Sequence, residues 1–227
     1  MKRRALFGGL VVLASIVPAG MASAQTAVNV SAQIGNFHVA VANYYHVPER
    51  EVVVVHEHHI PDDDLPVVFF IAREAHVPTA RIIDMREHGR SWWDISVHFG
   101  LRPDVYYVPV AYAPGPPYGH AYGHYKKPHD QWRSIVLSDD DVVNLVQLRF
   151  LSEHYKVPVE RVMDARNRSP HVVGMYSDIA ERRAVARDDH DDHGPDHAQH
   201  VSASEGHGNG NGKGKGRGNG HGKDHDD

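Results

Sequence analysis

Three helix-like runs of this chain are interrupted by the same dipeptide, at Val47-Pro48, Val77-Pro78 and Val157-Pro158. Proline is tolerated in the first turn of a helix, because its missing N–H would have no partner there and its φ is already helical. It also disfavours the helical conformation for the residue before it, so the preceding helix has to end there. Each Val-Pro pair therefore predicts a sharp corner between two helices, and three copies predict a repeated helix-corner-helix unit.

The residues around each corner keep a constant spacing. A small residue lies five positions before the Val, and an apolar residue lies five positions after it. The small residues are Ala42, Ala72 and Ser152, and the apolar residues are Val52, Ile82 and Val162. Such a pattern allows two short helices to close against each other through one apolar anchor.

This spacing resembles the helix-turn-helix motif of bacterial DNA-binding domains, which also combines a small residue, a turn and a buried aliphatic residue. The resemblance implies paired helices and, for that family, binding to nucleic acid. The family favours glycine in the turn, whereas these copies carry His46, His76 and Lys156. A fourth turn, within residues 91–101, does contain a glycine, Gly100.

The first 24 residues have the layout of an export signal. A basic stretch, residues 2–4, precedes an apolar run over residues 5–17, and the small residues Ala22-Ser23-Ala24 follow. This layout predicts a signal peptide cleaved before Gln25, and hence a periplasmic or secreted protein. One alternative is a retained membrane anchor, which the short and interrupted apolar run disfavours. Another is export by the twin-arginine route, for which only the paired arginines argue.

Removal of the signal would make the chain more acidic. The signal contains three basic residues and no acidic one, so the formal net charge falls from −5 to −8, with histidine counted as neutral. Nucleic-acid binding depends first on a positive surface, so this balance disfavours it. The chain has no cysteine, which excludes disulfide bonds and thiolate sites within it. Since no later apolar run is long enough to span a membrane, we expect a soluble mature protein without membrane contact.

Composition divides the rest of the chain into four parts. Residues 25–108 and 131–186 carry helix-like apolar patterns and predict two small helical halves. Residues 109–130 concentrate Pro, Gly, Tyr and His, which predicts an extended linker that lies on the halves through its aromatic side chains. Residues 187–227 hold ten of the twenty Gly and no aromatic residue, which predicts a disordered tail. The predicted fold class is all-α.

An acidic triplet precedes a strongly apolar run in each half. The first is Asp62-Asp63-Asp64, and the second is Asp139-Asp140-Asp141, which follows Ser138. Carboxylates before a first turn accept hydrogen bonds from free N–H groups and interact favourably with the helix dipole, so both triplets are interpreted as helix caps. Before the first triplet, four consecutive valines leave helix and strand open for residues 52–58.

Histidine is the residue type whose spacing points to chemistry. Four histidines of the tail recur at intervals of three, four and three: His190, His193, His197 and His200. Neutral imidazole is a good ligand for Zn²⁺, Ni²⁺ and Cu²⁺, so these four are predicted to be ligands in a loose chelating loop. Two alternatives are His56 with His58, which a strand would present together, and His120 with His124, provided that their segment is ordered.

No motif in the sequence points to catalysis or to a required cofactor. Two functional classes follow. The first is a non-catalytic bacterial envelope protein whose helical units bind a protein partner. Trp93 is its candidate contact, because it lies off the apolar stripe of its helix and aromatic anchors are frequent at interfaces. The second is a metal-sequestering protein that binds Zn, Ni or Cu weakly through its tail. Nucleic-acid binding is a remote third.

Overall fold

The computed structural model describes residues 20–191, and their side chains over residues 29–187. Within residues 20–191 the fold is all-α, as the sequence predicts, and contains no strand. The longer helices are α1 (Gly20–Tyr45), α2 (Glu49–Glu57), α3 (Leu65–Ala75), α4 (Thr79–Glu87), α7 (Asp139–Tyr155), α8 (Val159–Arg168) and α9 (Val172–Asp191). The shorter ones are α5 (Trp92–His98), α6 (Gly119–His124) and the 3₁₀ helices η1 (Pro103–Tyr106) and η2 (His129–Ser134).

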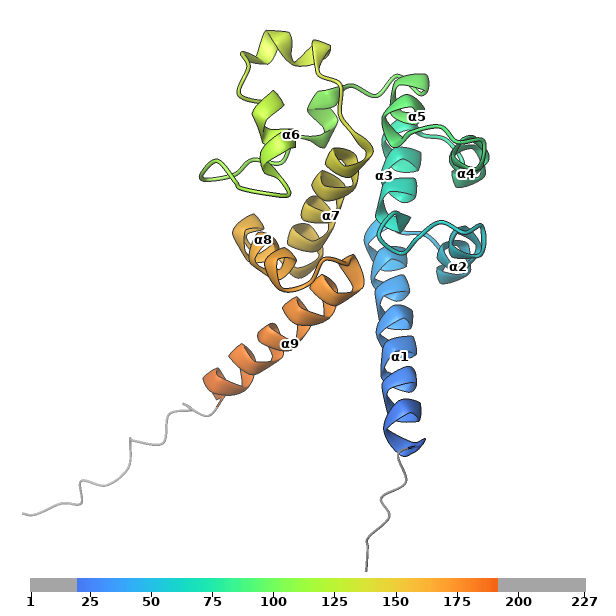
Figure 1. Cartoon of the computed structure of the whole chain (residues 1–227), viewed down its shortest axis with the longest axis vertical. Helices are drawn as coiled ribbons and strands as arrows, with labels where there is room; N and C mark the ends of the chain where they lie inside the picture. The colour runs from blue at the N-terminus through green and yellow to red at the C-terminus, as the bar shows by residue number, and fades with distance from the viewer. Residues whose placement is uncertain (1–19, 192–227) are drawn as a thin grey trace, which may run out of the picture.

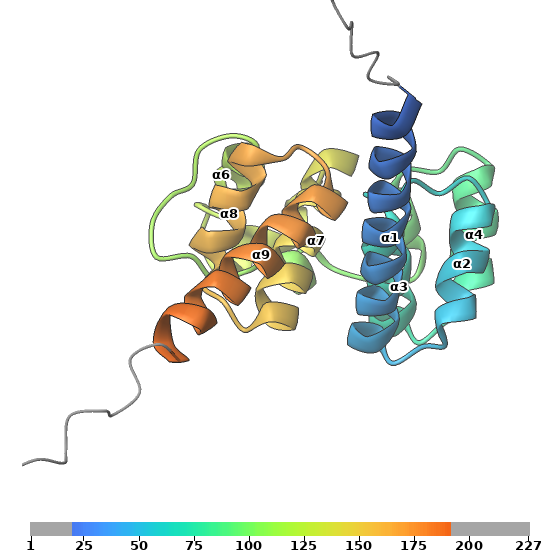
Figure 2. The same cartoon turned by 90° about the horizontal axis from the view of Figure 1, so that it is seen from below.

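Helices α1 and α3 run through the middle of the molecule. Helices α2 and α4 cover one side of them, while α7, α8 and α9 lie on the other side (Figures 1 and 2). Helix α3 packs directly on α7, so the two halves meet there. Buried apolar side chains from both halves belong to one cluster, whose largest fully buried members include Phe37, Phe69, Phe70, Trp92 and Phe150.

The three Val-Pro corners have the same backbone conformation. The residue before each Val is left-handed, with φ of 58° at His46, 57° at His76 and 56° at Lys156. The N–H of each corner Val donates to the carbonyl of the small residue five positions earlier, at 3.0, 3.1 and 3.0 Å respectively. This bond closes the helix end by satisfying a carbonyl that would otherwise lack a partner. A left-handed turn therefore forms at these corners without glycine, at a conformational cost of about 1–2 kcal/mol per residue.

The apolar anchors of the corners are inside the protein. Val52, Ile82 and Val162 are each fully buried. The run of valines in α2 forms a helix rather than a strand. Its burial pattern follows the helical period. Val52 and Val55 face the core, while Val53 and Val54 are exposed.

One carboxylate of the second triplet, that of Asp141, takes part in the cap of its own helix. The Ser138 hydroxyl accepts a hydrogen bond from the Asp141 N–H at 3.1 Å, and Oδ2 of Asp141 accepts one from the Ser138 N–H at 3.0 Å. This reciprocal pair is a capping box at the start of α7.

The prediction that the first triplet caps α3 is wrong. Asp64 occupies the cap position, but in the described structure its side chain makes no hydrogen bond to the first turn of α3. Its backbone is already helical, with φ of −95° and ψ of −15°, whereas a capping side chain requires an extended backbone at that position. The three carboxylates reach other elements instead.

One carboxylate from each acidic triplet caps a helix of the opposite half. Oδ1 of Asp63 accepts a hydrogen bond from the N–H of Val172 at 2.6 Å, at the start of α9. Oδ1 of Asp139 accepts one from the N–H of Trp92 at 2.6 Å, at the start of α5. Each half thus supplies the acid that satisfies a free helix N-terminus of the other half.

The segment 109–130 is not extended throughout, since it contains α6. Three of its tyrosines, Tyr118, Tyr122 and Tyr125, are buried. The Tyr122 hydroxyl donates to the carbonyl of Val108 at 2.6 Å, and the buried face of α6 lies against α7. Burial of these rings favours a short helix that the glycines of the segment would disfavour in isolation.

Helix α9 includes the first five residues of the predicted tail and ends at Asp191. Residues 192–227 lie outside the described part of the chain. The described part of the chain begins with helix α1 at Gly20, so most of the predicted signal peptide also lies outside the described part. No helix within residues 20–191 combines the length and the apolar character that are needed to cross a bilayer.

Candidate metal centre

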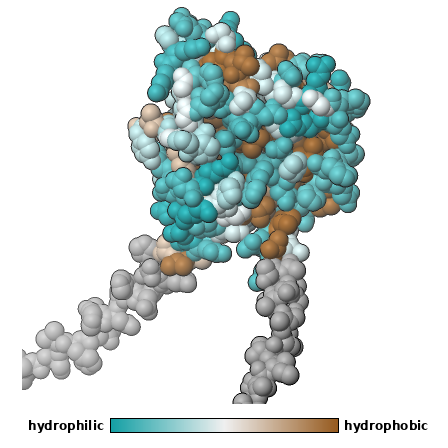
Figure 3. All heavy atoms as spheres, in the orientation of Figure 1, coloured by the Kyte–Doolittle hydropathy of each residue, from teal (hydrophilic) through white to brown (hydrophobic). Residues whose placement is uncertain are grey.

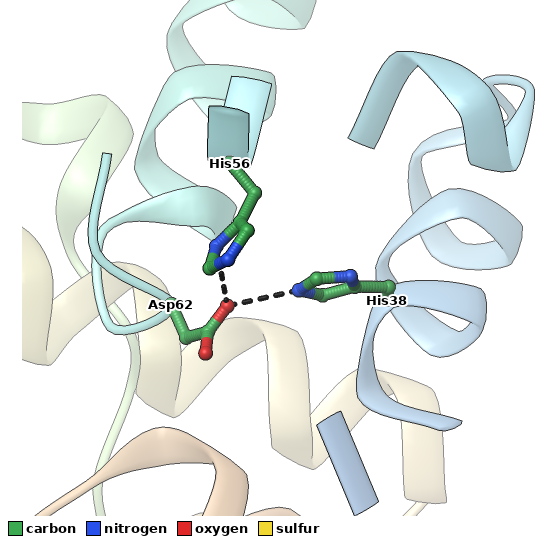
Figure 4. Close-up of side chains that lie close together, drawn as sticks. All are labelled: His38, His56 and Asp62. Carbon is green, nitrogen blue, oxygen red and sulfur yellow. Dashed lines mark hydrogen bonds and ion pairs between the residues drawn. The ribbon is translucent and has the colours of Figure 1, made fainter. Parts of the chain in front are cut away.

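His38, His56 and Asp62 converge from three different elements (Figure 4). Nε2 of His38, on α1, lies 2.9 Å from Oδ1 of Asp62. Nδ1 of His56, in the last turn of α2, lies 3.2 Å from the same oxygen. One possible ligand atom from each of the three residues lies within 4.8 Å of the other two.

The first corner of the chain brings these residues together. His38 precedes the corner residue His46 by eight positions, and His56 follows Pro48 by eight positions, so folding α2 back along α1 places the two rings side by side. Their centroids are 5.1 Å apart. After α2, His59 adopts a left-handed conformation with φ of 61°, which turns the chain back and places Asp62 between the rings.

The cluster is closed on one side and open on the other. The side chain of His38 is 8% exposed and that of Asp62 is 21% exposed, whereas that of His56 is 45% exposed. A small ion can therefore approach past His56, while α1 holds His38 in a fixed position. Because His38 is buried, bulk water screens its charge interactions less, and its interaction with any charge in the cluster is stronger.

The distances suit a tetrahedral ion of the zinc type. Bonds of about 2.0–2.1 Å to such an ion place two ligand atoms about 3.3 Å apart. The His38–Asp62 and His56–Asp62 separations of 2.9 and 3.2 Å are within about half an ångström of that value. Coordination would replace a proton on each imidazole nitrogen with the ion, and a set of three protein ligands leaves a fourth position open.

A second cluster of the same composition lies in the other half. His120 and His124 are on α6, and Asp141 is in the first turn of α7. Nδ1 of His120 lies 2.8 and 3.0 Å from the two carboxylate oxygens of Asp141. The segment that the sequence left open as a metal pair is therefore ordered, and it gains a carboxylate from α7.

Comparison with family models, with curated proteins and with solved structures gives no significant match.

Two other predicted site residues, His58 and Trp93, lie outside both clusters. His58 does not lie with His56, because its Nδ1 is 2.9 Å from Oε1 of Glu87. His190 is on α9, but its side chain, like all of His193, His197 and His200, lies outside the described residues. Trp93 is partly buried, with its ring centroid 6.3 Å from that of Tyr106, so only part of its ring is accessible.

Sequence reasoning missed His38 and Asp62 as partners of His56. The positions of the three residues along the chain match no metal-ligand motif, because the cluster depends on how two helices and a loop fold together. One signal was available for His38, which lies next to Phe37 and three positions before Val41 on a face that is otherwise apolar. A histidine on such a face requires a polar partner.

Burial raises the pKa of several tyrosine hydroxyls. Burial raises the pKa of Tyr44 to about 12, and its hydroxyl donates to Glu153 at 2.6 Å. Burial likewise raises the pKa of Tyr118 to about 12. These hydroxyls stay neutral at physiological pH, which disfavours a role as nucleophile or general base.

Proposed function

We propose that the protein is an exported, non-catalytic helical protein that binds a divalent transition-metal ion at His38, His56 and Asp62. The observation that carries the proposal is the convergence of two imidazoles and a carboxylate from three elements, with the two imidazole nitrogens 2.9 and 3.2 Å from one carboxylate oxygen. This ligand set suits Zn²⁺, Ni²⁺ or Cu²⁺, since imidazole is a preferred ligand of these ions. The open fourth position and the exposed His56 favour reversible binding.

Export is consistent with such a site. The basic and apolar segments before Gln25 support the signal peptide, and the chain contains no cysteine. A site of imidazoles and a carboxylate has no thiolate that an oxidising compartment would convert into a disulfide. His190, His193, His197 and His200 lie in the segment that the sequence predicts to be disordered, and they would add weaker binding, because an ion that binds such a segment has to order it.

The test is a calorimetric titration of the full chain with Zn²⁺. His56→Ala removes a ligand and should weaken the tighter binding event by at least about tenfold. His58→Ala is the matched control, because His58 ends the same helix but faces Glu87, and it should leave that event unchanged. Replacement of His190, His193, His197 and His200 by Ala should remove only weaker binding. Superimposable isotherms for wild type and His56→Ala would refute the site, and loss of all binding in the tail variant would assign metal binding to the tail.

A second candidate function is the binding of a protein partner by the outer helices. A groove of about 250 Å³ lies between α2 and α4, and exposed Val54 is part of its lining. The face shown in Figure 3 is mostly hydrophilic, with apolar residues in separate patches, so a partner would contact a small apolar area. Val54→Asp should weaken capture of such a partner and leave the zinc titration unchanged.

A further inference from the structure

The second cluster contains a buried polar atom to which no described residue forms a hydrogen bond. His120 and His124 lie one turn apart on α6, with ring centroids 4.9 Å apart and planes at 89°. Nε2 of His124 is buried and has no hydrogen-bond partner among the described residues. A buried ring nitrogen without a partner is destabilising, so such an atom in a folded protein calls for an explanation.

The carboxylate of this cluster is held in place before any ligand arrives. The side chain of Asp141 is 3% exposed, and its Oδ2 accepts the hydrogen bond from the Ser138 N–H that closes the capping box. A bond of this kind orients a metal-ligating carboxylate and contributes to affinity without touching the ion. The His120 side chain is 68% exposed and leaves the cluster open to solvent.

We infer that His120, His124 and Asp141 form a second site for a divalent transition-metal ion, and that this ion fastens the segment 109–130 to α7. A simple hydrogen bond between His120 and Asp141 explains the position of His120 but leaves the buried nitrogen of His124 unexplained. An ion bound by both imidazoles and the carboxylate accounts for all three side chains. The ligand set selects Zn²⁺, Cu²⁺ or Ni²⁺ over Mg²⁺ and Ca²⁺, which prefer oxygen ligands.

The site would act on a short helix that depends on tertiary contacts. Helix α6 has six residues, begins at Gly119 and contains Gly123, so its own helical propensity is low. An ion that binds α6 and α7 together stabilises only the state in which the two are packed, and therefore suppresses local opening of the segment. This consequence is independent of the His38 cluster, which shares no residue with this one.

Amide hydrogen exchange on the full chain, with free Zn²⁺ held constant by a chelating buffer, tests the inference peptide by peptide. At free zinc of 100 times the dissociation constant, amides of α6 that exchange through local opening should slow by on the order of 100-fold. His120→Ala, at an exposed position, should reduce this slowing to less than about tenfold, since one ligand is lost. His129→Ala, in the neighbouring η2 and outside the cluster, should retain it.

The same measurement separates the two metal sites. His56→Ala should leave the zinc-dependent slowing of α6 intact and abolish the slowing around residues 56–62. Absence of slowing in α6 at saturating zinc would overturn the second site, whatever happens around His56. Equal slowing of α6 in wild type and His120→Ala would also overturn it, because the ion would then act from elsewhere.

Discussion

The helix triplets α3–α4–α5 and α7–α8–α9 have the same corner conformation and the same spacing between helices, but different side chains. Residues 80 positions apart correspond, so the left-handed corner residue His76 matches Lys156, and the buried anchor Ile82 matches Val162. Neither pair of side chains is identical. The corner therefore depends on a small residue, a Val-Pro pair and an apolar anchor, and it tolerates either an imidazole or an ammonium group at the left-handed position.

The correspondence extends to an arginine in the second helix of each triplet. Arg86 donates to the carbonyl of Arg90 at 3.0 Å, and Arg166 donates to the carbonyl of Pro170 at 2.5 Å. Both arginines thus stabilise the loop that leads into the third helix. The equivalence of Arg86 and Arg166 becomes apparent only when the two corners are aligned.

The triplets differ in what surrounds these arginines. Arg86 also donates to Oδ2 of Asp139 at 2.7 Å and lies 4.3 Å from the ring centroid of Trp92. Arg166 contacts uncharged groups instead, namely the amide oxygen of Gln147 at 3.4 Å and Sδ of Met175 at 3.9 Å. Arg86 therefore connects the two halves, whereas these contacts of Arg166 all lie within its own half.

The largest expected effect tests whether the halves unfold together. Ile82→Asp and Val162→Asp each place a carboxylate at a fully buried anchor, and each should destabilise by about 3–5 kcal/mol. Because both anchors belong to one hydrophobic cluster, urea denaturation followed by circular dichroism should show a single transition in either variant. Two separate transitions, with only one shifted, would mean that the halves fold independently.

A smaller effect tests the exchange of helix caps between the halves. Asp63→Ala and Asp139→Ala each remove an acceptor from a helix N-terminus of the other half and should cost about 1–2 kcal/mol in the free energy of unfolding. Asp139→Ala should have the larger effect, because it also leaves Arg86 without this carboxylate. The exposed Asp140 supplies the control, and Asp140→Ala should stay within about 0.5 kcal/mol of wild type. Equal values for all three variants would contradict the exchange.

The corners could be predicted from sequence because their determinants are local. The Val-Pro pair and the apolar anchor lie within five positions of each other, so their spacing alone predicts a helix, a corner and a second helix. The left-handed conformation at His76 could not be predicted in this way, since it opposes the preference of histidine. The hydrogen bond from Val77 to Ala72 and the burial of Ile82 offset that preference in the folded protein.

The candidate metal sites could be predicted only in part. The sequence offered His120 and His124 as a pair on the condition that their segment is ordered, but Asp141 joins them only through the packing of α6 on α7. His38, His56 and Asp62 share no spacing at all. Asp62 was interpreted as a helix cap because composition cannot reveal the backbone angles that decide whether a carboxylate faces its own helix or a neighbour.

The smallest expected effect concerns His154 on α7, whose counterpart in α3 is Glu74. Burial, and to a lesser degree the charge of Arg183, lowers the pKa of His154 below its usual value near 6.5. Between the lowered pKa and about 6.5 the unfolded chain binds more protons than the folded one, so stability rises with pH through that window and falls on acidification. His154→Gln should therefore lose part of the decrease in melting temperature that wild type shows between pH 8 and pH 5. Arg183→Gln should lose a smaller part, because it removes only the weaker cause. An unchanged pH slope in His154→Gln would show that the helix at this position tolerates an imidazolium as readily as its counterpart in α3 tolerates a carboxylate.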